Sequence, residues 1–220
     1  MAARASALVL DFGGVISKTL FETHPSTEAA LGLPAGSLTW RGPFDEGGDP
    51  LWTAMQRGEI SERDYWLTRS REVGRLVGED WPDMQTLVRR SRGADPATAI
   101  RPEADRAIRR VDDAGFKLAI LSNELDLFYG ADFRHRLPLL GRFDVIVDAT
   151  YTGILKPDPR AYHDVVARLS LDPQACVFVD DQSRNIAGAG ACGLTTVLFD
   201  VKNPRRSYAE ALAHFDLSFD

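Results

Sequence analysis

Short, continuously apolar runs recur along the chain, and several of them are rich in valine or isoleucine. A run of this kind, without polar alternation, is typical of a strand that is buried on both faces, as in a parallel sheet. We therefore predict parallel strands at residues 7–10, 117–121, 145–147, 176–179 and 195–199.

Helical patterns separate several of these runs. Residues 103–114 follow Pro102 and stop at Gly115, and residues 159–170 precede the fourth run. Proline at a helix start and glycine just beyond a helix end are common boundary signals. Strands that alternate with helices predict an α/β fold with a doubly wound parallel sheet, a Rossmann-like core.

The segment from residue 16 to residue 99 has a different pattern. It contains no comparable apolar run, shows helix-like spacing at 61–77 and 84–92, and holds all four tryptophans. We predict an inserted helical cap domain at 16–99 and an α/β core formed by 1–15 and 100–220. A small helical unit needs large side chains for its core, so we expect most tryptophans to be packed and one to face a ligand. Breaks are expected at Leu33-Pro34, Gly42-Pro43, Gly47-Gly48 and Trp81-Pro82.

Composition narrows the function classes. The chain has 220 residues and a net charge of -6, so it lacks the basic excess typical of nucleic-acid binding. Its two cysteines have neither disulfide-framework nor zinc-site spacing. No apolar run approaches membrane-spanning length and no leader pattern precedes the first strand. We therefore expect a cytoplasmic protein without nucleic-acid or membrane partners, while its oligomeric state leaves no signal in the sequence.

Four polar motifs follow apolar runs in a fixed order. The carboxyl ends of strands in an open parallel sheet converge on one crevice. An aspartate, a hydroxyl, an ammonium group and paired carboxylates meeting there predict a phosphoryl-transfer site. The motifs are DFGGV at 11–15, SN at 122–123, KPDP at 156–159 and DD at 180–181, with Asn185 beyond.

Asp11 is the candidate nucleophile. Its position at a strand end projects the carboxylate into the crevice, and the glycines behind it, including Gly14, let the backbone approach a phosphate closely. Taken alone, DFGGV also fits an aspartate that caps a loop, because glycine turns after strands are common.

The SN and KPDP motifs supply candidate phosphate ligands. Ser122 offers a hydroxyl, and Asn123 offers a donor toward the substrate. Lys156 can neutralise charge on both the phosphate and Asp11, and it is one of only four lysines among 26 basic residues. Each motif also has a purely structural interpretation. Ser122-Asn123 is also typical of a turn, and most lysines on loops are simply solvated.

The adjacent carboxylates of Asp180 and Asp181 repel each other unless a cation is present. Mg²⁺ prefers oxygen ligands, so Asp181, Asp11 and the Gly13 carbonyl are its candidate ligands. Asp180 is then expected to act through water or to orient Lys156. Without a metal, the acidic pair is interpretable as a helix N-cap.

Together these motifs resemble the haloacid dehalogenase-like superfamily, and within it the Mg²⁺-dependent phosphatases with a helical cap. The resemblance covers residues 7–15 and 100–200, while the insertion matches the cap only in placement and helical character. It implies an aspartyl-phosphate intermediate on Asp11 and a small phosphorylated substrate.

The sequence departs from this pattern at Gly13, where such phosphatases usually carry a second aspartate that protonates the leaving group. Candidates for a replacement acid in the insertion are His24, Asp45, Glu46 and Asp49. None has a distinctive spacing, and each is also interpretable as an ordinary loop residue.

Three functions therefore stay open. A Mg²⁺-dependent phosphatase uses all four motifs. A dehalogenase that displaces halide with Asp11 tolerates Gly13 but has no need for the paired carboxylates. A binding or regulatory protein is motivated by Gly13 and opposed by the retention of four candidate site residues: Asp11, Ser122, Lys156 and Asp181. The substrate itself is not readable, because fold does not determine function.

Overall fold

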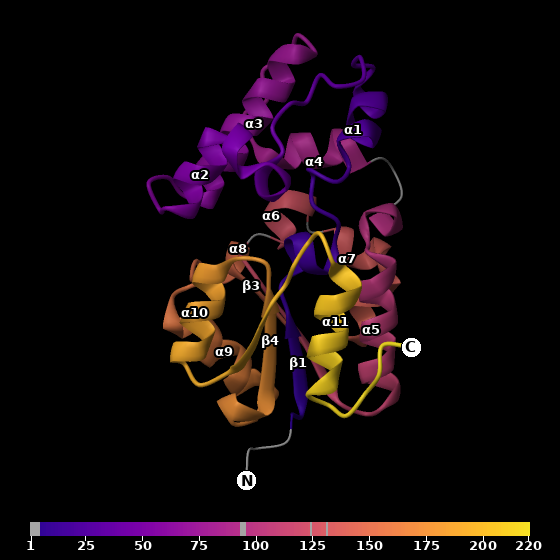
Figure 1. Ribbon diagram of the computed structural model, residues 1–220, viewed down its shortest axis with the longest axis vertical. Helices are drawn as coiled ribbons and strands as arrows, with labels where there is room; N and C mark the ends of the chain where they lie inside the picture. The colour runs from indigo at the N-terminus through magenta and orange to yellow at the C-terminus, as the bar shows by residue number, and fades with distance from the viewer. Residues whose placement is uncertain (1–4, 93–95, 124, 131) are drawn as a thin grey trace. The chain divides into compact units, whose positions relative to one another are not determined.

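The computed structural model describes residues 5–92, 96–123, 125–130 and 132–220. Over these ranges, five parallel strands form one sheet in the order β3-β2-β1-β4-β5 (Figure 1). The strands are β1 (Ala7–Leu10), β2 (Lys117–Ser122), β3 (Val145–Asp148), β4 (Cys176–Asp180) and β5 (Thr195–Leu198). All five predicted strands are confirmed, and four of their ends differ from the prediction by one residue.

The first strand lies at the centre of the sheet. β1 pairs in parallel with β2 on one side and with β4 on the other. This central position explains why β1 is buried along its whole length and apolar without alternation. It also places the residue after β1 between the carboxyl ends of two neighbouring strands.

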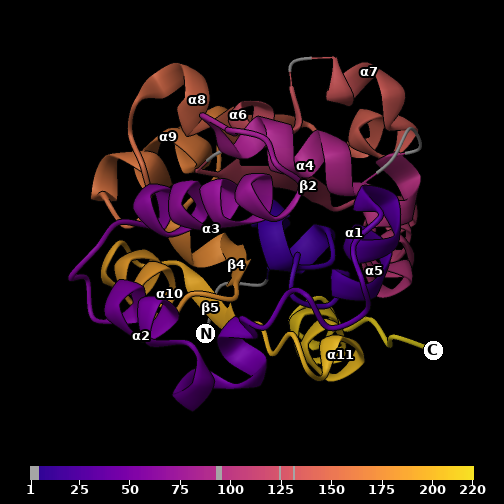
Figure 2. The same ribbon diagram turned by 90° about the horizontal axis from the view of Figure 1, so that it is seen from above.

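Helices cover both faces of the sheet (Figures 1 and 2), with α9 and α10 on one side and α5 and α11 on the other. The helices that follow residue 99 are α5 (Pro102–Asp113), α6 (Leu125–Tyr129), α7 (Phe133–Arg136), α8 (Ala149–Thr152), α9 (Pro159–Leu169), α10 (Ser183–Ala191) and α11 (Pro204–Ala213). Short 3₁₀ turns are η4 (Pro96–Ala99), η5 (Pro138–Arg142) and η6 (Pro173–Ala175). The predicted helices at 103–114 and 159–170 are confirmed as α5 and α9.

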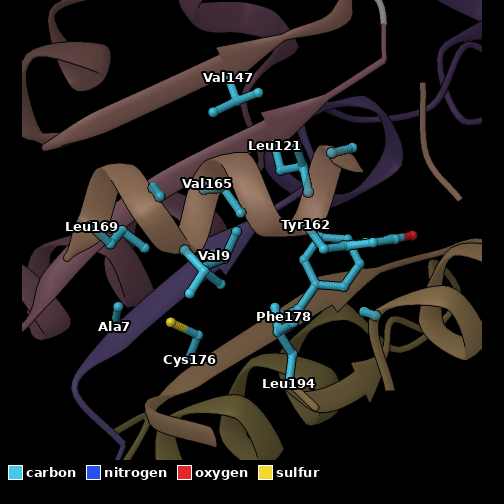
Figure 3. Close-up of a cluster of buried hydrophobic side chains, with 14 residues drawn as sticks. Ala7, Val9, Leu121, Val147, Tyr162, Val165, Leu169, Cys176, Phe178 and Leu194 are labelled. Atoms are coloured by element: carbon cyan, nitrogen blue, oxygen red, sulfur yellow. The ribbon is translucent and has the colours of Figure 1, made fainter. Parts of the chain in front are cut away.

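The core on one face of the sheet is packed against α9 (Figure 3). Ala7 and Val9 of β1 contribute to it, together with Phe178 of β4, and Tyr162 and Val165 of α9 cover them. Alternate strand residues point to opposite faces, so the other residues of β1 supply the opposite face of the sheet. The doubly wound arrangement is therefore confirmed at the level of individual side chains.

The chain forms two compact units. The first unit comprises Met1–Lys18, Ala99–Asp126 and Asp132–Asp220, and the second comprises Thr19–Thr98 and Leu127–Ala131. The sequence predicts the cap at 16–99, so the two divisions differ at 16–18, at 99 and at 127–131.

The described residues of the second unit form helices and turns but no strand. They are α1 (His24–Leu31), η2 (Gly42–Phe44), η3 (Glu46–Gly48), α2 (Pro50–Gln56), α3 (Glu62–Leu76) and α4 (Met84–Arg92). The predicted helices at 61–77 and 84–92 are confirmed. Ser61 and Asp64 close the start of α3 in a capping box, each side chain bonding the backbone amide of the other.

Aromatic rings form much of the second unit's core. Phe21 is 5.4 Å from Trp40, 5.2 Å from Trp52 and 5.4 Å from Trp66, measured between ring centroids. Trp40, Trp52 and Trp81 are buried, which confirms the packing interpretation for these three. Trp66 is only partly buried, and the expectation that one tryptophan faces a ligand stays a prediction.

Candidate active site

Asp11 lies directly after β1, and its backbone amide still donates to the Val179 carbonyl of β4 at 2.9 Å. The chain then enters η1 (Phe12–Ile16), a single π-type turn that is closed by the Ser17 amide donating to the Phe12 carbonyl at 2.9 Å. Gly14 has a φ of 79°, a left-handed conformation that glycine adopts without steric cost. The turn thus redirects the chain immediately behind the candidate nucleophile.

A buried group of side chains anchors this turn. Arg101 donates through Nε to the Gly14 carbonyl at 2.9 Å, and Tyr208 donates through its hydroxyl to the Val15 carbonyl at 3.1 Å. The Arg101 guanidinium lies 5.6 Å from the centre of the Phe199 ring, which in turn packs against Tyr208. These anchors were not predicted, because no local sequence pattern links residues so far apart.

Lys156 connects the candidate nucleophile, Asp11, to the fourth strand. Its Nζ donates to Asp11 Oδ1 at 2.7 Å and to Asp180 Oδ2 at 2.6 Å, and its side chain is only 1% exposed. Burial alone would lower the pKa of Lys156, but the charges of Asp11 and Asp180 outweigh burial and raise it. The side chain therefore stays a protonated ammonium beside Asp11.

Asp180 is completely buried at the end of β4. In addition to Lys156, it accepts hydrogen bonds from the Gln182 amide at 2.8 Å and from Asn185 Nδ2, which lies 3.1 Å from both carboxylate oxygens. Both oxygens are thus engaged by protein donors. This geometry corresponds to the orienting role toward Lys156 that the sequence suggested as one of two alternatives.

Asp11, Asp180 and Asp181 form an acidic group in which one oxygen of each carboxylate lies within 4.8 Å of the others. Three carboxylates this close together repel one another, which favours a bound cation. Carboxylate oxygens are the donors that Mg²⁺ prefers, so the donor set fits this ion. The contribution of the Gly13 carbonyl stays a prediction.

Ser122 and Asn123 differ in their surroundings. Ser122 is the last residue of β2, is buried, and stands in register with Asp148 of β3. The Asn123 side chain contacts the KPDP loop: its Oδ1 accepts from the Lys156 amide at 2.6 Å, and its Nδ2 donates to the Lys156 carbonyl at 3.2 Å. Asn123 therefore positions the backbone of Lys156, while phosphate binding by Ser122, Asn123 and Gly14 stays a prediction.

A polar network beyond β3 was missed at the sequence level. Asp148 Oδ2 accepts from the Asp126 amide at 2.9 Å and from Arg134 at 3.0 Å, and its Oδ1 accepts from the Thr150 amide at 2.9 Å. Arg134 also donates to Asp126, which accepts from the Tyr151 hydroxyl at 2.6 Å. The sequence did contain a signal for this network, because Asp148 directly follows the apolar run 145–147, just as Asp11 directly follows the run 7–10.

The candidate acids of the insertion all belong to the second unit. Asp49 is fully buried and engaged by Arg69 and by the Tyr65 hydroxyl, which is a structural role. Asp45 caps η3 by accepting from the Gly48 amide. The side chain of Glu46 lies outside the described residues. None of these observations identifies a proton donor.

His24 is 3% exposed, and neither ring nitrogen has a hydrogen-bond partner in the part of the chain that is described. Burial, followed by the nearby positive charge of Arg41, lowers its pKa from 6.5 to about 4. The imidazole is therefore neutral at pH 7. Its ring centroid lies 4.3 Å from that of Trp40, so it forms part of the aromatic core.

The fold is of the α/β class, and it carries an aspartate directly after the central strand. A model of the haloacid dehalogenase-like hydrolase family matches residues 5–193. The chain belongs to this family.

Similar proteins of several activities support this assignment. Acyl-CoA dehydrogenase family member 10 of Mus musculus is 31% identical over 96% of this chain, which spans only 19% of that protein. Protein CbbY (plasmid) of Cupriavidus necator is 35% identical, with coverage of 87% of this chain and 77% of that protein. (S)-2-haloacid dehalogenase 1 of a Pseudomonas species is 32% identical, with coverage of 76% and 73%, respectively.

Solved structures show the same fold. YfnB of Bacillus subtilis, determined with bound magnesium, has a TM-score of 0.70 at 18% identity and covers 98% of this chain and 100% of its own. A HAD phosphatase from Thermococcus onnurineus has a TM-score of 0.54 at 21% identity, with coverage of 89% and 86%. At these identities the likeness concerns the fold alone.

Two further features of the described residues concern the cysteines and the helices. Cys176 and Cys192 are both free thiols. Among the helices in the described ranges, none has the length and apolar character required to cross a membrane.

Proposed function

We propose that this protein is a Mg²⁺-dependent phosphatase that hydrolyses a small phosphorylated metabolite. The acidic group formed by Asp11, Asp180 and Asp181 is the observation that carries the proposal. A phosphoryl group brings additional negative charge to a nucleophilic carboxylate, so its transfer requires nearby positive charge. Lys156 is already shared between Asp11 and Asp180, which supports the need for a cation.

The proposed mechanism assigns each residue a step. Asp11 attacks phosphorus as the bond from phosphorus to the leaving-group oxygen breaks, which forms an aspartyl-phosphate. Water then attacks this phosphorus, so that inorganic phosphate leaves and the Asp11 carboxylate is regenerated. Lys156 holds the Asp11 carboxylate in place and offsets charge on the phosphoryl oxygens. Ser122, Asn123 and the Gly14 backbone are the proposed phosphate-binding groups. Mg²⁺, held by Asp11, Asp181 and the Gly13 carbonyl, would supply further charge neutralisation.

A dehalogenase is the second candidate, because Gly13 provides no acid and a departing halide needs no proton. The identity to (S)-2-haloacid dehalogenases, 32% in one case and 27% in another, also favours it. A purely binding protein is the third candidate. The 2.7 Å contact between Lys156 and Asp11 opposes that reading, since it retains a charged pair suited to catalysis.

The test is phosphate release from a panel of sugar, nucleotide and acyl phosphates, measured with Mg²⁺ and with excess chelator. We expect activity only with Mg²⁺, its complete loss in Asp11→Asn, and a loss of about 10²-fold or more in Asp181→Ala. Asp105→Asn is the matched control, because this aspartate forms an exposed pair with Arg109 on α5 and should leave the rate unchanged.

Three outcomes contradict the proposal. Phosphate release that persists in excess chelator excludes the metal. Halide release from short 2-haloacids without metal, accompanied by no phosphate release, establishes the dehalogenase. A folded protein without turnover on either class supports the binding role.

A further inference from the structure

The turn behind Asp11 contains two consecutive glycines, Gly13 and Gly14. Glycine loses more conformational freedom on folding than any other residue, so this pair is the part of the turn that is most easily misplaced. The proposed function uses the backbone of both residues, the Gly13 carbonyl toward Mg²⁺ and the Gly14 backbone toward phosphate. These groups keep fixed positions only if other parts of the chain hold the turn.

The backbone of Arg101 is tied to the end of this turn. The Ile16 carbonyl accepts a hydrogen bond from the Arg101 amide at 3.0 Å, and Ser17 and Ile100 form an antiparallel bridge. The chain returns to the first unit at Ala99, just before this point. The Arg101 side chain therefore starts from a backbone that is fixed beside the turn.

That side chain reaches the glycine pair. Its Nε donates to the Gly14 carbonyl at 2.9 Å, and its guanidinium lies 5.6 Å from the centre of the Phe199 ring. Arg101 is only 2% exposed. Burying a guanidinium costs free energy that an apolar side chain of similar size would avoid. Filling this space does not by itself require an arginine, whereas holding the Gly14 carbonyl requires a buried donor.

We propose, on the basis of the proposed function, that Arg101 is a positioning residue for catalysis. By holding the Gly14 carbonyl, it keeps the Gly13-Gly14 backbone in the one conformation that supplies ligands for Mg²⁺ and phosphate. The next carbonyl of the turn has an anchor of its own, because the Tyr208 hydroxyl donates to Val15 at 3.1 Å. Arg101 differs from Tyr208 in acting on the glycine pair itself.

Two substitutions of similar size separate the hydrogen bond from the packing. In Arg101→Gln, the amide nitrogen occupies the same place along the side chain as the arginine Nε, so a donor to the Gly14 carbonyl is retained without the charge. Arg101→Met has a comparable length and no donor. Arg109→Met is the control, because Arg109 forms an exposed pair with Asp105 on α5, the helix that follows Arg101.

Three quantities would be measured for each variant: kcat/KM per folded molecule with Mg²⁺, Mg²⁺ binding by calorimetry, and the free energy of unfolding. We expect Arg101→Met to lower kcat/KM and Mg²⁺ affinity by about 10- to 100-fold, the range typical of residues that orient a metal ligand. Arg101→Gln should recover most of both losses, and Arg109→Met should leave both quantities unchanged. A role in packing alone would lower only the free energy of unfolding.

Unchanged kcat/KM and Mg²⁺ affinity in folded Arg101→Met overturn the inference, because the glycine pair is then held without Arg101. Arg101→Gln that is as impaired as Arg101→Met also overturns it, because the loss then does not depend on the hydrogen bond. Failure of the proposed function is distinguishable, because the natural protein then releases no phosphate.

A third variant keeps the inference testable if Arg101→Met does not fold. Arg101→Lys keeps the charge but carries its nitrogen one bond further along the side chain than the arginine Nε. We expect Arg101→Gln to have the higher kcat/KM and the higher Mg²⁺ affinity of the two. Lysine values equal to or above those of glutamine overturn the inference, because the charge and not the placed donor is then what matters.

Discussion

Asp180 and Asp181 are neighbours in sequence, yet their side chains have different surroundings. Asp180 is fully buried and held by Lys156, Gln182 and Asn185, whereas Asp181 is partly exposed. Asp180 is the last residue of β4 and Asp181 lies just beyond the strand, yet one oxygen of each carboxylate lies within 4.8 Å of the other. The orienting carboxylate and the candidate metal ligand can therefore occupy consecutive positions.

The candidate site was predictable from the sequence to the extent that strand ends determine it. Asp11, Lys156 and Asp180 are brought into contact, as the convergence of parallel strands requires. The direction of the Asn123 amide was not predictable, because it depends on the KPDP loop 33 residues further along. Arg101 was missed for the same reason, since its carbonyl partner at Gly14 is 87 positions away.

His24 leads to a prediction about pH. Its pKa is lowered from 6.5 to about 4 in the folded protein, so between these values the unfolded chain binds a proton that the folded chain does not. The free energy of unfolding should therefore fall as the pH drops from 6.5 to 4, by up to about 3 kcal/mol from this residue.

Denaturant titrations at pH 7, 5.5 and 4.5 would measure this effect. In His24→Phe the loss of unfolding free energy between pH 6.5 and 4 should be smaller than in the natural protein. Phenylalanine does not titrate, and its ring suits the aromatic surroundings. His214→Phe is the control, since His214 is exposed. An unchanged pH dependence in His24→Phe would show that the histidine is not held neutral by folding.

At the scale of elements, continuous apolar runs predicted the five strands and periodic patterns predicted α3, α4, α5 and α9, whereas α10 was not predicted. α10 has the sequence SRNIAGAGA, which lacks the spacing of bulky residues that marks an amphipathic helix. Its Gly188 packs so closely that a Cβ there would lie 2.9 Å from Pro157 and 3.0 Å from the Tyr162 hydroxyl. Gly188 therefore permits close packing of α10 against these residues, whereas glycine in a sequence is usually taken as a sign that a helix ends.

Gly42 in η2 gives a prediction for the second unit. Its φ is 49°, and a Cβ at this position would lie 2.4 Å from the Phe21 ring at the centre of the aromatic core. Gly42→Ala should therefore destabilise the protein by about 1–3 kcal/mol from overpacking, in addition to about 1–2 kcal/mol from the left-handed backbone.

Gly36→Ala separates these two contributions. Gly36 has a φ of 83° with no atom near its Cβ position, so its substitution reports backbone strain alone. Chemical denaturation followed by tryptophan emission would compare the variants. Equal losses of unfolding free energy in Gly42→Ala and Gly36→Ala would show that the aromatic core rearranges to accommodate the added methyl group without cost.

At the scale of the whole molecule, the alternation of strands and helices was sufficient to predict the parallel sheet and its connection by α5 and α9. The short helices α6, α7 and α8 were not predicted, because each spans five residues or fewer and shows no full period of a helical pattern. The assignment of 127–131 to the second unit was not predictable either, since it depends on tertiary contacts and not on local pattern.

All four tryptophans lie between residues 40 and 81, whereas the acidic group lies entirely in the first unit. Tryptophan fluorescence therefore measures unfolding of the second unit. Circular dichroism also measures unfolding of the sheet in the first unit. If the separate cores unfold independently, Mg²⁺ at 100 times its dissociation constant should stabilise the first unit by about 2.7 kcal/mol and leave the fluorescence transition in place. A shift of both transitions together would instead measure the energetic coupling between the two units, and Asp181→Ala should abolish either response.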